Sequence, residues 1–152
     1  MKALKIAVFW LLVGFGLIQF IQIDVPPAPK ATPTDEIQAT PKVMAMLKRS
    51  CYDCHSNHTV WPWYSHVAPI AWEVRSHVRD GRNWLNFSIW NRYDVAKRVK
   101  FYKGIIKSID WKMPPEDYVW IHKNARLSKE DRAFIKEWAQ KELDRLDQNS
   151  SD

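Results

Sequence analysis

Five consecutive residues, Cys51-Tyr52-Asp53-Cys54-His55, combine two thiols and an imidazole at a spacing that suits one particular chemistry. Thiols three positions apart lie on one helical turn and can reach the two vinyl groups along one edge of a porphyrin. The imidazole that follows can ligate the iron from one side. Both cysteines of the chain belong to this motif. The motif therefore predicts a single, covalently attached c-type haem.

Two other interpretations of these residues stay open. A bare Cys-x-x-Cys also occurs as a dithiol redox pair, but such pairs accompany alternating strands and helices, which the sequence does not indicate. A structural zinc site needs further cysteine or histidine ligands at a matching spacing. The chain has no second cysteine pair that would supply them.

A ligand for the opposite side of the iron would come from a distant segment. Met113 lies in Trp111-Lys112-Met113-Pro114-Pro115, where a thioether suits haem iron and the prolines fix the backbone of the loop. A methionine that fills a gap in the core is the other interpretation. An imidazole in place of the thioether would lower the reduction potential. The histidines that compete for this position are His77, His122, His58 and His66.

Residues 1–23 have the pattern of a transmembrane signal anchor. An apolar run from Ile6 to Ile23 follows Lys2 and Lys5, and its length at helical rise is roughly 27 Å, close to the thickness of a hydrocarbon core. The positive-inside rule leaves the N-terminus in the cytoplasm and exports the chain after Asp24. A cleaved signal peptide is the alternative, although no small-x-small site directly follows the run.

The remaining organisation follows from composition. Residues 24–40 contain four prolines and are interpreted as a semi-extended linker, residues 41–147 as the haem-binding domain, and residues 148–152 as a tail. The net charge of +6 suits an acidic redox partner or anionic lipid, or reflects a solvated surface without a special partner. Export removes nucleic acid as a partner.

Helical periodicity dominates the domain and predicts an all-α fold. Thr40 and Pro41 can start a helix that delivers Cys51, and Ser128 can cap a C-terminal helix through a capping-box-like pair with Asp131. The nine tryptophans either cover a haem or pack the core. The expected helices span residues 41–51, 69–80 (ended by Gly81), 95–109 and 128–146.

Several short motifs extend this pattern from Pro41 to Glu142. They are Ser50–Asn57, Trp61–Tyr64, His77-Val78, Gly81-Arg82, Leu85–Ser88 with Trp90, Met113–Pro115, Tyr118, His122, Ala125, Leu127-Ser128 and Trp138. Their order resembles the class I cytochrome c fold and, more narrowly, a bacterial haem-binding domain family of single-haem c-type cytochromes. The resemblance implies covalent haem on Cys51 and Cys54, with His55 and Met113 as its axial ligands. The Trp-rich insert from Val60 to Trp90 departs from better-known cytochromes c.

These observations predict a membrane-anchored cytochrome on the periplasmic side of the bacterial inner membrane, held by a single-pass helix. It would be an electron carrier rather than an enzyme, because two filled axial positions suit outer-sphere transfer to redox proteins. The rival is a haem-based gas sensor or peroxidase-like enzyme, whose open distal pocket would be lined by tryptophan, His122 and Arg75 or Arg82. A third possibility is a redox subunit that works only inside a respiratory complex.

Overall fold

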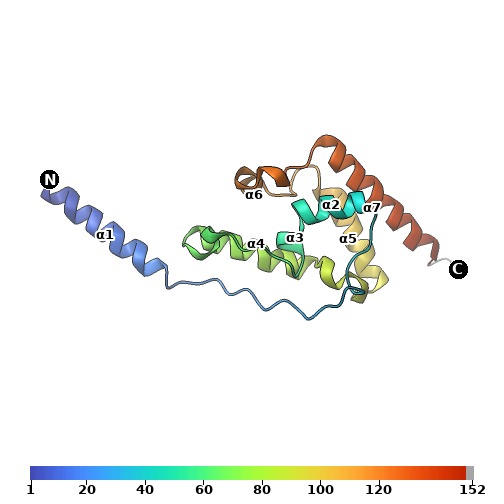
Figure 1. Cartoon of the computed structure of the whole chain (residues 1–152), viewed down its shortest axis with the longest axis horizontal. Helices are drawn as coiled ribbons and strands as arrows, with labels where there is room; N and C mark the ends of the chain where they lie inside the picture. Colours follow the sequence, from blue (N-terminus) through green and yellow to red (C-terminus); the bar gives the residue numbers. More distant parts are fainter. Residues whose placement is uncertain (150–152) are drawn as a thin grey trace.

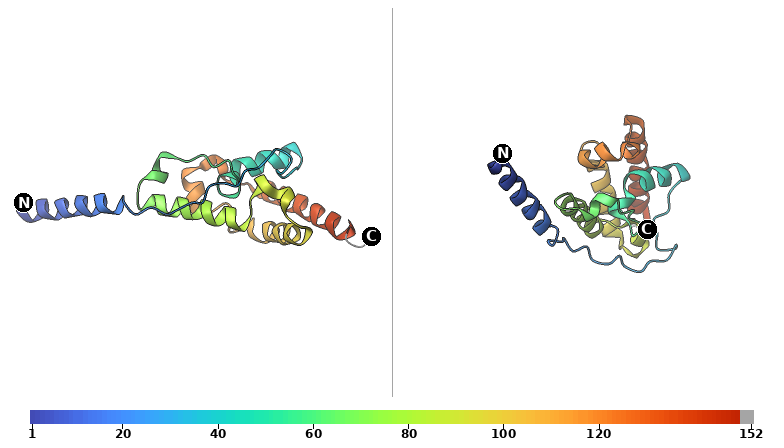
Figure 2. Two further views of the ribbon diagram at one scale, coloured as in Figure 1. Left: turned by 90° about the horizontal axis from the view of Figure 1, so that it is seen from below. Right: turned by 60° about the vertical axis from the view of Figure 1, so that its left-hand side comes forward.

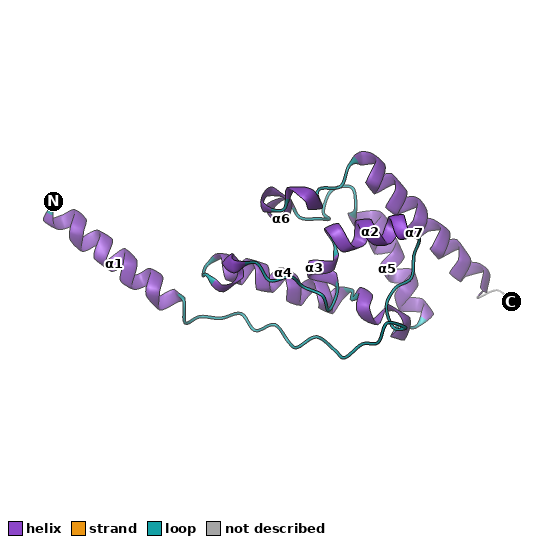
Figure 3. Ribbon diagram, in the orientation of Figure 1, coloured by secondary structure: helices purple, strands orange, loops and turns teal. Residues whose placement is uncertain are grey.

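The computed structural model describes residues 1–149, and every regular element in this part of the chain is helical (Figures 1 and 3). The all-α prediction is therefore confirmed. The last residues of the expected tail, 150–152, lie outside the described residues, and residues 148 and 149 continue the final helix. The elements are α1 (Lys2–Ile18), α2 (Pro41–Ser50), α3 (Tyr52–His55), η1 (Trp63–His66), α4 (Ile70–Trp84), η2 (Phe87–Arg92), α5 (Val95–Ser108), α6 (Glu116–Ile121), η3 (Lys123–Ala125) and α7 (Lys129–Asn149).

Side-chain caps explain where the main helices begin. The Thr40 hydroxyl accepts a hydrogen bond from Val43 N at 3.5 Å at the start of α2, and the Asp94 carboxylate accepts one from Lys97 N at 2.7 Å at the start of α5. Ser128 and Asp131 cap each other's backbone N–H groups before α7, at 3.0 and 3.3 Å. This reciprocal pair is the predicted capping box, and it satisfies two donors that the first helical turn leaves free.

The core lies where α5 and α7 pack side by side, with α2 and η2 closing it (Figure 1). Aromatic rings dominate it: Trp90 meets Tyr102 at 4.9 Å between ring centroids, and Tyr102 meets Trp138 at 5.5 Å. Both tryptophans are buried, whereas Trp63, Trp111 and Trp120 are exposed. The tryptophans therefore divide between the core and other positions.

The proline-rich segment lies along the domain instead of standing free. Its Ile37 is 1% exposed and packs in the core, and Ile37 N donates to the Phe87 carbonyl at 2.9 Å. Asp35 forms an ion pair with Arg92 at 2.7 Å, and Asn57 donates to the Pro29 carbonyl. Burial of one large apolar side chain and these polar contacts attach the segment to η2 and α3.

The transmembrane helix expected within residues 1–23 is not found. In the described part of the chain, residues 1–149, no helix combines the length and the apolar character that a membrane crossing requires. Helix α1 ends at Ile18, because the following Gln19 turns its side chain amide onto the backbone of Ala68. From this point α1 extends away from the domain (Figure 2).

Candidate functional site

A cavity of about 610 Å³ lies between α3, α4, the end of α5 and the loop that leads to α6. This volume is typical of cofactor and small-molecule sites. Most of its wall is apolar, and leucine, isoleucine, tryptophan and proline side chains contribute to it. Four residues singled out from the sequence line this one cavity: Cys51, Cys54, His55 and Met113.

The two cysteines reach the cavity because the chain turns between two helices at Cys51. Helix α2 ends there with φ −130°, and α3 starts at the next residue. Both thiols are free, and burial raises the pKa of each to about 12. A dithiol redox centre requires a lowered thiol pKa, so the environment argues against that interpretation.

The zinc interpretation lacks ligands. Among the described residues, the one group of side chains that could hold a metal ion is Glu73, His77 and Asp117, and it includes neither cysteine. A tetrahedral site at Cys51 and Cys54 would need two further nitrogen or sulfur ligands.

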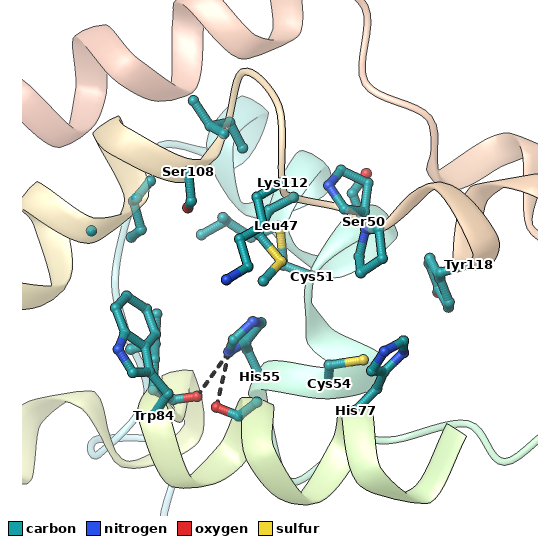
Figure 4. Close-up of a pocket in the computed structure, with 18 of the residues that line it drawn as sticks. Leu47, Ser50, Cys51, Cys54, His55, His77, Trp84, Ser108, Lys112 and Tyr118 are labelled. Atoms are coloured by element: carbon teal, nitrogen blue, oxygen red, sulfur yellow. Dashed lines mark hydrogen bonds between the residues drawn. The ribbon is translucent and has the colours of Figure 1, made fainter. Parts of the chain in front are cut away.

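The His55 ring is oriented for ligation by the backbone of α4. Its Nδ1 lies 3.0 Å from the Gly81 carbonyl and 3.1 Å from the Leu85 carbonyl (Figure 4). A ring nitrogen between two carbonyl oxygens must carry the proton and donate, which leaves Nε2 unprotonated in the neutral ring. Burial also lowers the pKa of His55 and so favours the neutral form. A hydrogen bond from the second nitrogen to a carbonyl is the usual support of a metal-bound histidine.

Gly81 allows this arrangement by letting α4 approach α3. A Cβ atom at Gly81 would lie 2.6 Å from the Cys54 carbonyl oxygen and 3.0 Å from Cys54 Cβ. The sequence prediction that Gly81 ends its helix is therefore wrong: α4 continues through it to Trp84. The glycine serves a close helix contact and not a helix terminus.

Met113 is held on the cavity wall by contacts to its backbone. Arg132 of α7 donates to the Met113 carbonyl at 2.9 Å and also to the Ile109 carbonyl, while Met113 N donates to the Ser108 carbonyl at 3.1 Å. Pro114, buried next to it, lines the same wall. These contacts fix the loop that carries the thioether.

The competing histidines have other partners. His77 lines the cavity (Figure 4), but its Nε2 lies 3.0 Å from a Glu73 carboxylate oxygen and its Nδ1 3.8 Å from one of Asp117. His122 does not line the cavity; its Nε2 lies 3.2 Å from the Tyr64 hydroxyl. The exposed His58 and His66 lie outside the cavity as well.

The arginines proposed for a distal pocket are also used elsewhere. Arg75 donates to the Ser65 carbonyl, and Arg82 donates to Ser56 O at 2.8 Å and to the Thr59 hydroxyl at 2.7 Å. Neither lines the cavity. The Arg82 contacts instead fix the chain that leaves the Cys-x-x-Cys-His motif.

Some cavity residues were not singled out from the sequence as site residues. The Trp84 ring meets the His55 ring edge-on at 6.3 Å and fits against α5 because position 104 is glycine. The Tyr118 hydroxyl donates to Asp53 at 2.7 Å, next to Cys54. Lys107 and Lys112 place cations in the lining, where they suit acidic groups of a cofactor. Nothing in the local sequence marks these residues, because they come together only through helix packing.

The donor set and the cavity therefore fit a haem: two thiols, one oriented imidazole and one thioether line a mostly apolar space. Comparison with known proteins agrees. A family model described as a haem-binding domain matches residues 13–141. No curated protein and no solved structure matches the chain significantly.

Proposed function

Because the chain belongs to the haem-binding domain family, we propose that it is a c-type cytochrome that carries one electron at a time between redox proteins. The observation that carries this proposal is the pair of hydrogen bonds from His55 Nδ1 to Gly81 and Leu85, at the cavity that both cysteines and Met113 also line. One haem c would be attached through Cys51 and Cys54.

Bound haem supplies an iron that alternates between the ferrous and ferric states. His55 offers Nε2 to it, and Met113 offers a thioether, which would favour a higher reduction potential than a second imidazole. Trp84, Leu85 and Ile105 give the cavity apolar walls that exclude water. These groups hold the cofactor rigidly, and rigidity suits electron transfer because little has to reorganise when the charge changes.

The positions of the polar side chains favour a carrier over a sensor or a peroxidase-like enzyme. Either alternative requires an open ligand position with hydrogen-bond donors beside it. Arg75, Arg82 and His122, the donors considered for that role, have partners outside the cavity. Met113 takes the corresponding place in the proposal.

The proposed location is the periplasmic face of the bacterial inner membrane. It rests on Lys2 and Lys5 before the apolar N-terminal segment, and on the attachment of c-type haem outside the cytoplasm. The proposed partners are redox proteins or a respiratory complex, and the N-terminal segment provides the contact with the membrane.

A potentiometric titration of the full chain, produced in cells that attach c-type haem, tests the proposal. We expect one reversible one-electron transition and no rapid change of the reduced spectrum when carbon monoxide is added. Rapid carbon monoxide binding by the wild-type protein would instead indicate an open iron and would support the sensor or enzyme.

A further inference from the structure

One end of the domain carries most of the exposed large apolar side chains that follow the N-terminal segment. It is called the aromatic end below. Two of its tryptophans are almost fully accessible, Trp63 at 79% and Trp120 at 78%. Its members are Val60, Trp61, Trp63, Ile70, Trp120 and Ile121.

Contacts between two distant segments build this end. The Trp63 ring packs edge-on against Tyr64, whose hydroxyl meets His122 Nε2 at 3.2 Å, and His122 directly follows the exposed Trp120-Ile121 pair on α6. Arg75 of α4 lies 5.7 Å from the Trp61 ring. The aromatic side chains are thus held on a folded support rather than on a loose loop, and their exposure is a stable property of the surface.

Helix α1 leaves the domain at this same end. Gln19 and Ala68 exchange two hydrogen bonds, at 2.9 and 3.2 Å, and Trp72 Nε1 donates to the Ile21 carbonyl at 2.7 Å. Ala68 lies between η1 and α4, beside the exposed Ile70. Three residues separate Ile18 from Ile21, so the end of α1 lies within roughly 11 Å of a fixed point of the domain along the chain.

Apolar side chains surround α1, and none of its residues is buried. A helix that is apolar on all sides requires an apolar environment. Figures 1 and 2 show α1 pointing away from the domain, with η1, α6 and the start of α4 on the side that faces it. An apolar environment around α1 therefore ends close to the aromatic end.

We propose that the aromatic end is a docking surface for the lipid bilayer, so that the domain is held against the membrane through Trp63, Trp120 and their neighbours while α1 is embedded in lipid. Tryptophan suits this position because its ring prefers the boundary between hydrocarbon and water. The inference rests on the membrane location proposed above. It adds that the domain has one fixed face toward the membrane and does not swing on a long tether.

Hydroxyl-radical footprinting of the full chain in vesicles of zwitterionic and anionic phospholipid, read by mass spectrometry, tests this inference. Trp111 is a matched internal control, because it is 71% exposed and lies outside the aromatic end. Without docking, Trp63, Trp120 and Trp111 should be oxidised at similar rates. Docking predicts that oxidation of Trp63 and Trp120 is slower than that of Trp111 by on the order of tenfold, because water is excluded from their surroundings.

A variant with Trp63→Asp and Trp120→Asp gives the second readout. Trp61 should then be oxidised faster, whereas Trp111→Asp should leave Trp61 unchanged. Equal rates for all three tryptophans in wild-type vesicles would overturn the proposal and leave the surface to a protein partner. Protection that grows with protein density at constant lipid would also overturn it, in favour of a second copy of the chain. The haem absorbance of the same samples reports separately on the proposed electron carrier.

Discussion

Replacing Gly81 with alanine perturbs the contact that orients His55. The added Cβ would meet the Cys54 carbonyl oxygen at 2.6 Å, where ordinary contacts begin at 3.4 Å. The obstacle is backbone and cannot rotate aside, so α4 must move away from α3. Because α4 also provides the Gly81 and Leu85 carbonyls, the same movement weakens both hydrogen bonds of His55 Nδ1.

The expected cost follows from three terms. Alanine in a helix interior is ordinarily more favourable than glycine by about 0.5–1 kcal/mol. Overpacking of a tight contact costs about 1–3 kcal/mol, and weakening the histidine hydrogen bonds costs about 1 kcal/mol more. We therefore expect Gly81→Ala to lower the free energy of unfolding by about 2 kcal/mol, although helix propensity alone predicts a gain.

Urea unfolding of the full chain in mild detergent, followed by circular dichroism, measures this change. Gly104→Ala is the matched control, because its Cβ would meet the ring of Trp84, a side chain that is 41% exposed and can turn outward. We expect a smaller loss for Gly104→Ala. A Gly81→Ala protein at least as stable as wild type would refute the reasoning.

Three further predictions concern the iron ligand, an ion pair and the N-terminal strap of the domain. Met113→Ala should retain covalent haem but lower the reduction potential and allow carbon monoxide to bind; an unchanged potential in a redox titration would exclude Met113 as ligand. The Arg92 guanidinium holds the pKa of Asp35 below its ordinary value, so this pair contributes stability above about pH 4 that is lost as the pH falls. Asp35→Asn should lower the urea midpoint at pH 7 and flatten its acid dependence, and identical pH profiles would contradict the assignment. Ile37→Ala should cost about 2–5 kcal/mol of unfolding free energy because the side chain is in the core; exposed Gln38→Ala serves as control, and equal small losses would show that the strap is not part of the fold.

Features that depend on neighbouring residues were predictable from the sequence. Thr40 and the Ser128–Asp131 pair form their expected caps, since a cap needs only residues within one helical turn. The helices that begin at Pro41, Val95 and Lys129 follow from these caps and from apolar periodicity.

Features that depend on distant residues were not predictable. Gly81 has the local appearance of a helix end, but its neighbour Cys54 lies 27 positions earlier and decides its role. Ile37 lies in a proline-rich segment, and only the pairing with Phe87 makes it part of the core. His77 has the same helical periodicity as buried residues, yet carboxylates from two elements occupy both of its nitrogens. In each case tertiary packing outweighs the local pattern.

The absorption spectrum of the oxidised full chain, produced in cells that attach c-type haem, tests the central claim most directly. Our account predicts a low-spin ferric spectrum with the weak red band of sulfur-to-iron charge transfer, which requires His55 and Met113 on one iron. The haem should remain with the chain after denaturation, through Cys51 and Cys54. A high-spin spectrum, or haem that separates from the denatured chain, would contradict the account.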